Sequence, residues 1–311
     1  MRAAALLAAI VLAGCGDGGG TTDAPIDSLV SESPGVSGSA NDVVQLTRRL
    51  PPGADGYSAV DVAAVKDGLG MSDSADPIGD TEVFALTSPA LSGIFTSNPE
   101  KKVVAALDLS EATAFAGSPD RQYEFVTAVE TDADEADLRE SLRKLGFLEN
   151  QGVLEGPYGV DAIAEPPQTI TSEVGAAPTK PERFEHRPIA IRFFDGGFLV
   201  SNSRESLRRL GSVADELPAE ALEGMDGEMV FGRDGGSDCV RSQGLETNMD
   251  GSGRVIFVID GAPEPAGFSP EGSDPYGEPT VAGERLIVPL ETDGPESPRQ
   301  VIADTLPGYD C

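Results

Sequence analysis

The sequence contains no tryptophan, one histidine and three cysteines among its 311 residues. Aromatic residues make up only 5% of the chain, which leaves little material for the stacking surfaces of a sugar-binding site. His186 is the single histidine, so a Ser-His-Asp triad has one candidate imidazole and a histidine-based metal site lacks its partners. Because His186 lies in the polar stretch 183–187, the sequence favours an exposed loop position for it.

Basic residues are scarce as well. Lys and Arg number 22 against 53 Asp and Glu, which gives a formal net charge of −31. This sign excludes nucleic acid as a partner and excludes electrostatic adhesion to anionic lipid. The acidity favours a soluble exported protein, while a basic partner or a cation stays open as an alternative. Arg outnumbers Lys 17 to 5, which is typical of a GC-rich genome such as that of an actinobacterium.

A long apolar run is also missing. The N-terminal run, residues 3–13, has eleven residues, whereas a helix that spans about 30 Å of hydrocarbon needs about 20. Arg2 precedes this run, and Leu12-Ala13-Gly14-Cys15 ends it. The four residues resemble the lipobox of prokaryotic lipoproteins, which implies a signal peptide at 1–14, cleavage between Gly14 and Cys15, and a diacylglycerol on the Cys15 thiol. An ordinary secretory signal that ends in a chance cysteine is the alternative.

A lipid on Cys15 predicts the location of the protein. Acyl chains anchor a protein to the membrane without a spanning helix, so we expect it on the outer face of the cytoplasmic membrane, or in the periplasm or outer membrane of a cell that has one. Residues 15–41 combine this cysteine with a Gly-, Ser- and Pro-rich stretch that predicts a flexible tether. We expect an α+β domain at 42–217 and a second α+β half at 218–311, as one domain or as two closely packed halves.

Once Cys15 is acylated, Cys239 and Cys311 remain. In an oxidising compartment, two such thiols favour a disulfide, and closing this 73-residue loop stabilises the fold by roughly 4 kcal/mol on a chain-entropy argument. A metal or catalytic thiol is the alternative, but no other cysteine lies at zinc spacing from either residue.

Hydrophobic periodicity predicts a mainly antiparallel sheet with packed helices. Residues 123–130 alternate as a strand on a core, and Asp132 to Glu135 form a capping signal for a helix that ends at Gly146. Asp195-Gly196-Gly197 predicts a hairpin turn, after which Ser203 caps a helix with Leu207, Leu210 and Leu217 inward. The similar phrases at 142–146 and 207–211 suggest a weak strand-helix repeat. Further strands are expected at 56–60, 112–116, 229–231, 254–259 and 285–290, and further helices at 43–50, 80–95, 103–107 and 298–306.

Three phrases carry a resemblance to a known family. They are the segment 50–62, with its Leu-Pro-x-x-Ala-x-x-Tyr pattern, the Gly-Phe-Leu-Glu-Asn segment at 146–150, and the Asp-Gly-Gly hairpin that precedes Ser201-Asn202-Ser203. Together they resemble a family of bacterial envelope proteins of unknown function, over residues 43–217. The resemblance implies fold and location and carries no activity.

Catalytic motifs find little support in the chain. Ser141 and Lys144 match the Ser-x-x-Lys phrase of penicillin-interacting enzymes, but a helical leucine stripe already explains the segment, and no Lys-Thr-Gly phrase accompanies it. Two groups of aspartates lack the register of an EF-hand: Asp73, Asp76 and Asp80, and Asp132, Asp134 and Asp137.

The sequence therefore predicts no cofactor, no metal site and no enzyme, but a binding or scaffold protein that contacts another envelope protein or the cell wall. A solute-binding lipoprotein of a transporter and an envelope hydrolase are the alternatives.

Overall fold

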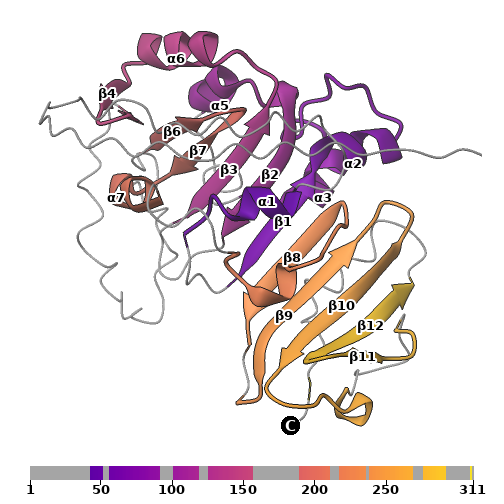
Figure 1. The fold of residues 1–311 in the computed structure, drawn as a ribbon. Helices are drawn as coiled ribbons and strands as arrows, with labels where there is room; N and C mark the ends of the chain where they lie inside the picture. The colour runs from indigo at the N-terminus through magenta and orange to yellow at the C-terminus, as the bar shows by residue number, and fades with distance from the viewer. Residues whose placement is uncertain are drawn as a thin grey trace, which may run out of the picture. The chain divides into compact units, whose positions relative to one another are not determined.

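The described part of the chain forms one twelve-stranded antiparallel sheet in the order β11-β12-β10-β9-β8-β1-β2-β3-β7-β6-β5-β4 (Figure 1). This computed structural model describes residues 43–51, 56–91, 101–118, 125–156, 189–210, 217–235, 238–268, 276–291 and 309. The strands are β1 (Tyr57–Asp61), β2 (Ala112–Ser118), β3 (Val126–Thr131), β4 (Leu148–Asn150), β5 (Val153–Glu155), β6 (Ala190–Phe194), β7 (Gly197–Ser201), β8 (Met229–Asp234), β9 (Val240–Thr247), β10 (Ser252–Ile259), β11 (Thr280–Ala282) and β12 (Arg285–Glu291).

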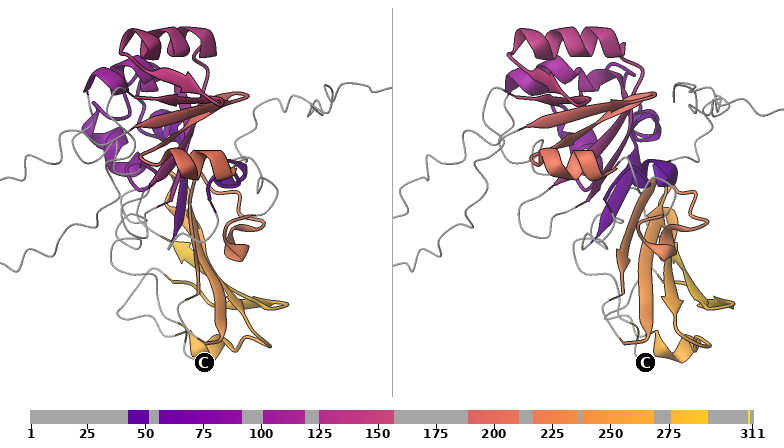
Figure 2. Two further views of the ribbon diagram at one scale, coloured as in Figure 1. Left: turned by 90° about the vertical axis from the view of Figure 1, so that its left-hand side faces the viewer. Right: turned by 60° about the vertical axis from the view of Figure 1, so that its left-hand side comes forward.

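Helices cover both faces of the first half of the sheet. Because neighbouring strand residues point to opposite faces, Val129 and Ala128 of β3 belong to two different hydrophobic clusters. The cluster that contains Val129 also contains buried side chains of α2 (Val62–Gly68), α3 (Thr81–Thr87), α5 (Lys101–Leu107) and α6 (Glu135–Lys144). The cluster with Ala128 receives α1 (Val43–Thr47), α7 (Arg204–Arg209) and the 3₁₀ turn η4 (Glu220–Leu222), and Figure 2 shows these helices on the two sides of the strands.

The segment from β3 to α6 forms as its sequence predicts. The Asp134 carboxylate accepts hydrogen bonds from the first-turn amides of Ala136 and Asp137, which satisfies two of the donors that a helix start leaves open. Gly146 follows α6 with a φ of 93°, the left-handed conformation that ends many helices. Two acid–base pairs four residues apart stabilise the exposed face of α6, at 2.6 Å between Arg139 and Glu135 and at 2.7 Å between Lys144 and Glu140.

The sheet continues across the boundary that the sequence suggests near residue 217. Strand β8 lies after that boundary and pairs with β1, from the start of the fold, so that Tyr57 faces Gly232 and Val60 faces Met229. Figure 1 shows β1 and β8 side by side, with β9, β10, β12 and β11 continuing from β8. The prediction of an α+β fold with a mainly antiparallel sheet is confirmed.

Some elements differ from the sequence prediction. Strand β9 was not expected, because its residues Ser242, Gly244 and Glu246 alternate as a polar face instead of an apolar one. Leu217 lies beyond the end of α7 at Arg209, where it packs only partly buried, so it is not part of the helical stripe. The predicted helix at 298–306 lies outside the described residues.

A third cluster covers one face of the last strands. It consists of residues of β9, β10 and β12, among them Leu245, Phe257 and Val288, and it is overlaid by aromatic rings from loops. The ring of Phe257 lies 5.9 Å from those of both Phe268 and Tyr309. Phe268 also pairs with Tyr309 through an isolated β-bridge, which brings the last described residue onto this cluster.

Candidate functional site

The residues with the strongest functional prediction lie outside the described part of the chain. Gly14 and Cys15 belong to a segment that the structure does not describe, so cleavage and lipidation stay predictions. His186, for which the sequence favours an exposed loop, also lies outside the described residues. No helix in the described ranges has both the length and the apolar character to cross a membrane.

The predicted Cys239–Cys311 disulfide has one described partner. Cys239 lies just before β9 and packs against the third cluster, the same cluster that Tyr309 contacts. Cys311 follows Tyr309 by two residues, a distance of at most about 7 Å along an extended chain. The contact of Tyr309 therefore supports the predicted pairing, which stays a prediction because Cys311 is not described.

Three of the acidic residues singled out in the sequence accept hydrogen bonds from the main chain. Asp80 and Asp134 are the N-caps of α3 and α6, and the carboxylate of Asp76 accepts a hydrogen bond from the amide of Ile78. Lys144 pairs with Glu140. Within the described ranges, no three His, Cys, Asp or Glu side chains are grouped as metal ligands.

The phrases that carry the family resemblance also have structural roles. The fully buried Tyr57 donates a hydrogen bond from its hydroxyl to the carbonyl of Pro51, 3.2 Å away, so it closes the Leu-Pro turn onto β1. The hydroxyl of Ser201 donates to the carbonyl of Phe125, and the amide of Phe125 donates to the side chain of Asn202. The Ser-Asn pair thus holds the start of β3, and these motifs fix the fold.

Two titratable groups have shifted pKa values. Burial raises the pKa of Asp61 above its ordinary value, although hydrogen bonds from the amides of Ala64 and Ala63 oppose that shift. Burial lowers the pKa of Lys66, and the carboxylates of Asp73, Glu111 and Asp76 offset part of the effect. The Lys66 ammonium donates to the carbonyls of Asp73, at 2.7 Å, and Ser110, at 2.9 Å. Lys66 therefore ties α2 to the loop before α3 and to η1 (Leu109–Glu111).

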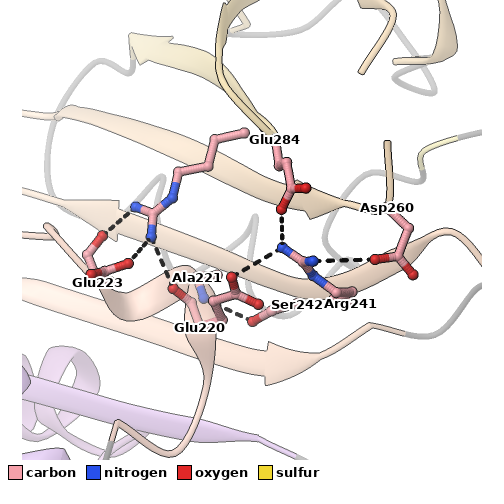
Figure 3. Close-up of polar contacts among 8 residues, drawn as sticks. Glu220, Ala221, Glu223, Arg241, Ser242, Asp260 and Glu284 are labelled. Carbon is pink, nitrogen blue, oxygen red and sulfur yellow. Dashed lines mark hydrogen bonds and ion pairs between the residues drawn. The ribbon is translucent and has the colours of Figure 1, made fainter. Parts of the chain in front are cut away.

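A cluster of charged side chains gathers at one end of strands β9 and β12 (Figure 3). The Arg241 guanidinium contacts three carboxylates from three segments: Glu284 at 2.6 Å, Glu220 at 3.0 Å and Asp260 at 3.3 Å. The hydrogen bond with Glu284 is the main reason that the pKa of Arg241 is raised. Sequence analysis missed this cluster, because its members are spread over 65 residues and share no motif.

The cluster holds down a segment that we call the strap, residues 219–228, which includes η4 and crosses one face of β8, β9 and β10. Arg285 donates to the Glu223 carbonyl at 2.6 Å and pairs with its carboxylate at 2.5 Å. Ser242 of β9 accepts a hydrogen bond from the Ala221 amide at 2.9 Å. Arginines and main-chain hydrogen bonds therefore fix the strap on the sheet, and this face is the candidate binding surface of the protein.

No protein-family model matches the chain, and no curated protein sequence matches it. Among solved structures, crystal forms I, III and IV of TP0453 are similar, each at 13% sequence identity. Form I covers 83% of this chain and 96% of TP0453 with a TM-score of 0.43. Forms III and IV give TM-scores of 0.38 and 0.39, and cover 83% and 85% of this chain and 98% and 97% of that one. Scores of this size carry no argument about function.

Proposed function

We propose that this protein is a lipid-anchored, extracytoplasmic protein of the cell envelope that acts by binding another envelope component and performs no catalysis itself. The observation that carries the location is the Leu12-Ala13-Gly14-Cys15 sequence after a short apolar run. The Gly-, Ser- and Pro-rich residues that follow Cys15 give the folded part a tether, so that it reaches a partner away from the membrane.

The described residues favour binding over chemistry. Of the side chains that sequence analysis tested for catalysis or metal binding, Asp80 and Asp134 are engaged in helix caps and Lys144 in a surface ion pair. A net charge of −31 keeps such a protein soluble and suppresses non-specific adhesion to other anionic surfaces. A specific partner must therefore be recognised through a local surface.

Replacing the acylated sulfur tests this proposal. Cys15→Ser removes the only thiol in the lipobox, so we expect the variant to take up no labelled fatty acid and to leave the membrane fraction. Cys239→Ser is the control for loss of a thiol outside the lipobox, because its lipid labelling should stay intact even though its folded part is less stable. The mass of the mature N-terminal peptide gives a direct readout. Continued labelling and membrane sedimentation of Cys15→Ser would overturn the proposed anchor.

Partner binding needs a separate experiment. Crosslinking of the anchored protein in intact cells, followed by purification and mass spectrometry, should recover a defined envelope component. Failure to recover one, together with turnover of an envelope substrate by the purified protein, would contradict a binding role.

A further inference from the structure

The turn between β9 and β10 places a methionine against the end of α2. The Cβ, Cγ and Cε atoms of Met249 each lie 2.9 Å from the point where a Cβ atom on Gly68 would stand. Met249 therefore fills space that is open because residue 68 is a glycine. The sulfur joins Cγ to Cε, so the thioether lies at this contact.

The described methionines gather at one hydrophobic cluster. Met71, Met229 and Met249 pack in or against the cluster that contains Val129, whereas Met225 belongs to the cluster on the other face of the sheet. Of the described residues in the Val129 cluster, only Met229 and Met249 come after residue 217. On this face, the strands β8 to β10 therefore contact the first part of the chain through thioether side chains.

Access to water separates these methionines. Met225 is 5% exposed and Met229 is 8% exposed, so the protein shields both sulfurs. Met249, at the tip of its hairpin, is only partly buried, and so is Met71. A dissolved oxidant must reach a sulfur before it can react, so Met249 is open to a reaction from which Met229 is protected.

Hydrogen bonds fix the main chain around Met249. Its amide donates to the carboxylate of Glu228, at 2.5 Å, and the amide of Glu228 donates to the side chain of Asn248, at 3.1 Å. The carbonyl of Glu228 accepts from the amide of Asp61, at 2.7 Å, and Asp61 is the N-cap of α2. The turn, the residue before β8 and α2 thus form one connected unit, in which a chemical change at the Met249 side chain strains the contact with α2.

We propose that Met249 is a site of oxidation by peroxides, and that its sulfoxide releases the β9–β10 turn from α2. A lone pair of the sulfur attacks one peroxide oxygen, the O–O bond breaks and an S=O bond forms. The sulfur loses two electrons and hydrogen peroxide gains them, and the departing hydroxide takes the proton of the transferred oxygen and leaves as water. The new oxygen is a polar acceptor to which the apolar side chains of the cluster donate no hydrogen bond, so it favours contact with water over contact with α2.

The order of oxidation tests the site. Full-length protein in peroxide-free detergent is treated with limiting hydrogen peroxide, and peptide mass spectrometry follows each methionine over time. We expect Met249 to be oxidised at least about fivefold faster than Met229, because only Met249 is accessible in the folded protein. Equal rates for the two would overturn the proposal.

Hydrogen exchange tests the release of the turn. Oxidised wild type should exchange about tenfold faster than untreated protein at residues 248–252 and 66–71. Met249→Leu should lose this response, because leucine keeps an apolar side chain of similar volume and has no sulfur. Met71→Leu is the matched control, since it removes the other partly buried thioether of the cluster, and it should respond as the wild type does.

A polar substitution separates the effect of the sulfoxide from other damage by peroxide. Met249→Gln places a polar group at this position without any oxidant, so it should show the faster exchange of the oxidised wild type. A response of Met249→Leu to peroxide as large as that of the wild type would overturn the proposal, and so would wild-type exchange in Met249→Gln. Both measurements concern the folded part, so their outcome does not depend on the proposed lipid anchor.

Discussion

Asp61 combines a favourable hydrogen bond with an unfavourable charge. Its carboxylate caps α2 by accepting the Ala64 amide at 2.8 Å, while burial raises its pKa. The ionised form therefore costs stability above the folded-state pKa, and this cost disappears as the pH falls through that pKa towards the ordinary value of 3.8.

Substitutions at Asp61 separate the two effects. Asparagine caps helices as well as aspartate does and carries no charge, so Asp61→Asn should be at least as stable as the wild type at pH 7. Asp61→Ala loses the cap and should be about 1 kcal/mol less stable. Urea unfolding between pH 7 and pH 4 should show that the free energy of unfolding of the wild type rises relative to that of Asp61→Asn as the pH falls. The opposite trend would contradict the assigned pKa direction.

Lys66 is a buried ammonium that acts as a structural donor. Lys66→Met keeps most of the side-chain volume but leaves the carbonyls of Asp73 and Ser110 without this donor, at a cost of about 1 to 3 kcal/mol. Hydrogen exchange should show the loss of protection concentrated in residues 71–80 and 109–111. Lys102→Met removes an exposed lysine and is the matched control. Uniform loss of protection over the sheet would contradict the local role.

At the scale of elements, the packing of the strap on Gly232 of β8 and Gly244 of β9 is the most restrictive contact. Gly244→Ala places a methyl group against Met225 and should destabilise the protein by about 1 to 3 kcal/mol. Met225→Ala in the same chain removes the clash, so the double variant should be more stable than the sum of the two single effects predicts. Thermal unfolding of the four proteins measures this coupling, and strict additivity would mean that the two residues do not compete for space.

Elements with local signals were predictable, and those that depend on tertiary contacts were not. Asp134, the leucines of α6 and Gly146 specify a helix within thirteen consecutive residues. Strand β9 has no such signal, because Ser242, Gly244 and Glu246 contact the strap and do not form an apolar face. The Arg241 cluster was hidden for the same reason, because Glu220 and Glu284 meet only after three strands have paired.

At the scale of the whole molecule, we predict that a Cys239–Cys311 disulfide fastens the last residues of the sequence to the sheet. In oxidising buffer, Cys239→Ser should have a free energy of unfolding about 4 kcal/mol lower than that of the wild type. When the disulfide of the wild type has been reduced, the two proteins should be about equally stable. Non-reducing peptide mapping should recover Cys239 linked to Cys311. Two alkylatable thiols in the oxidised wild type would refute the pairing.

The pairing of β1 with β8 constrains the order in which the protein can fold. A growing chain provides β2 and β3 soon after β1, but the residue that faces Tyr57 on its other side, Gly232, comes 175 residues later. Until that residue has been synthesised, the central strand of the finished sheet has an open edge, which is the feature that makes nascent strands prone to mispairing. A chaperone that shields this edge during synthesis would therefore protect the yield of native protein more than one that acts on either terminal strand.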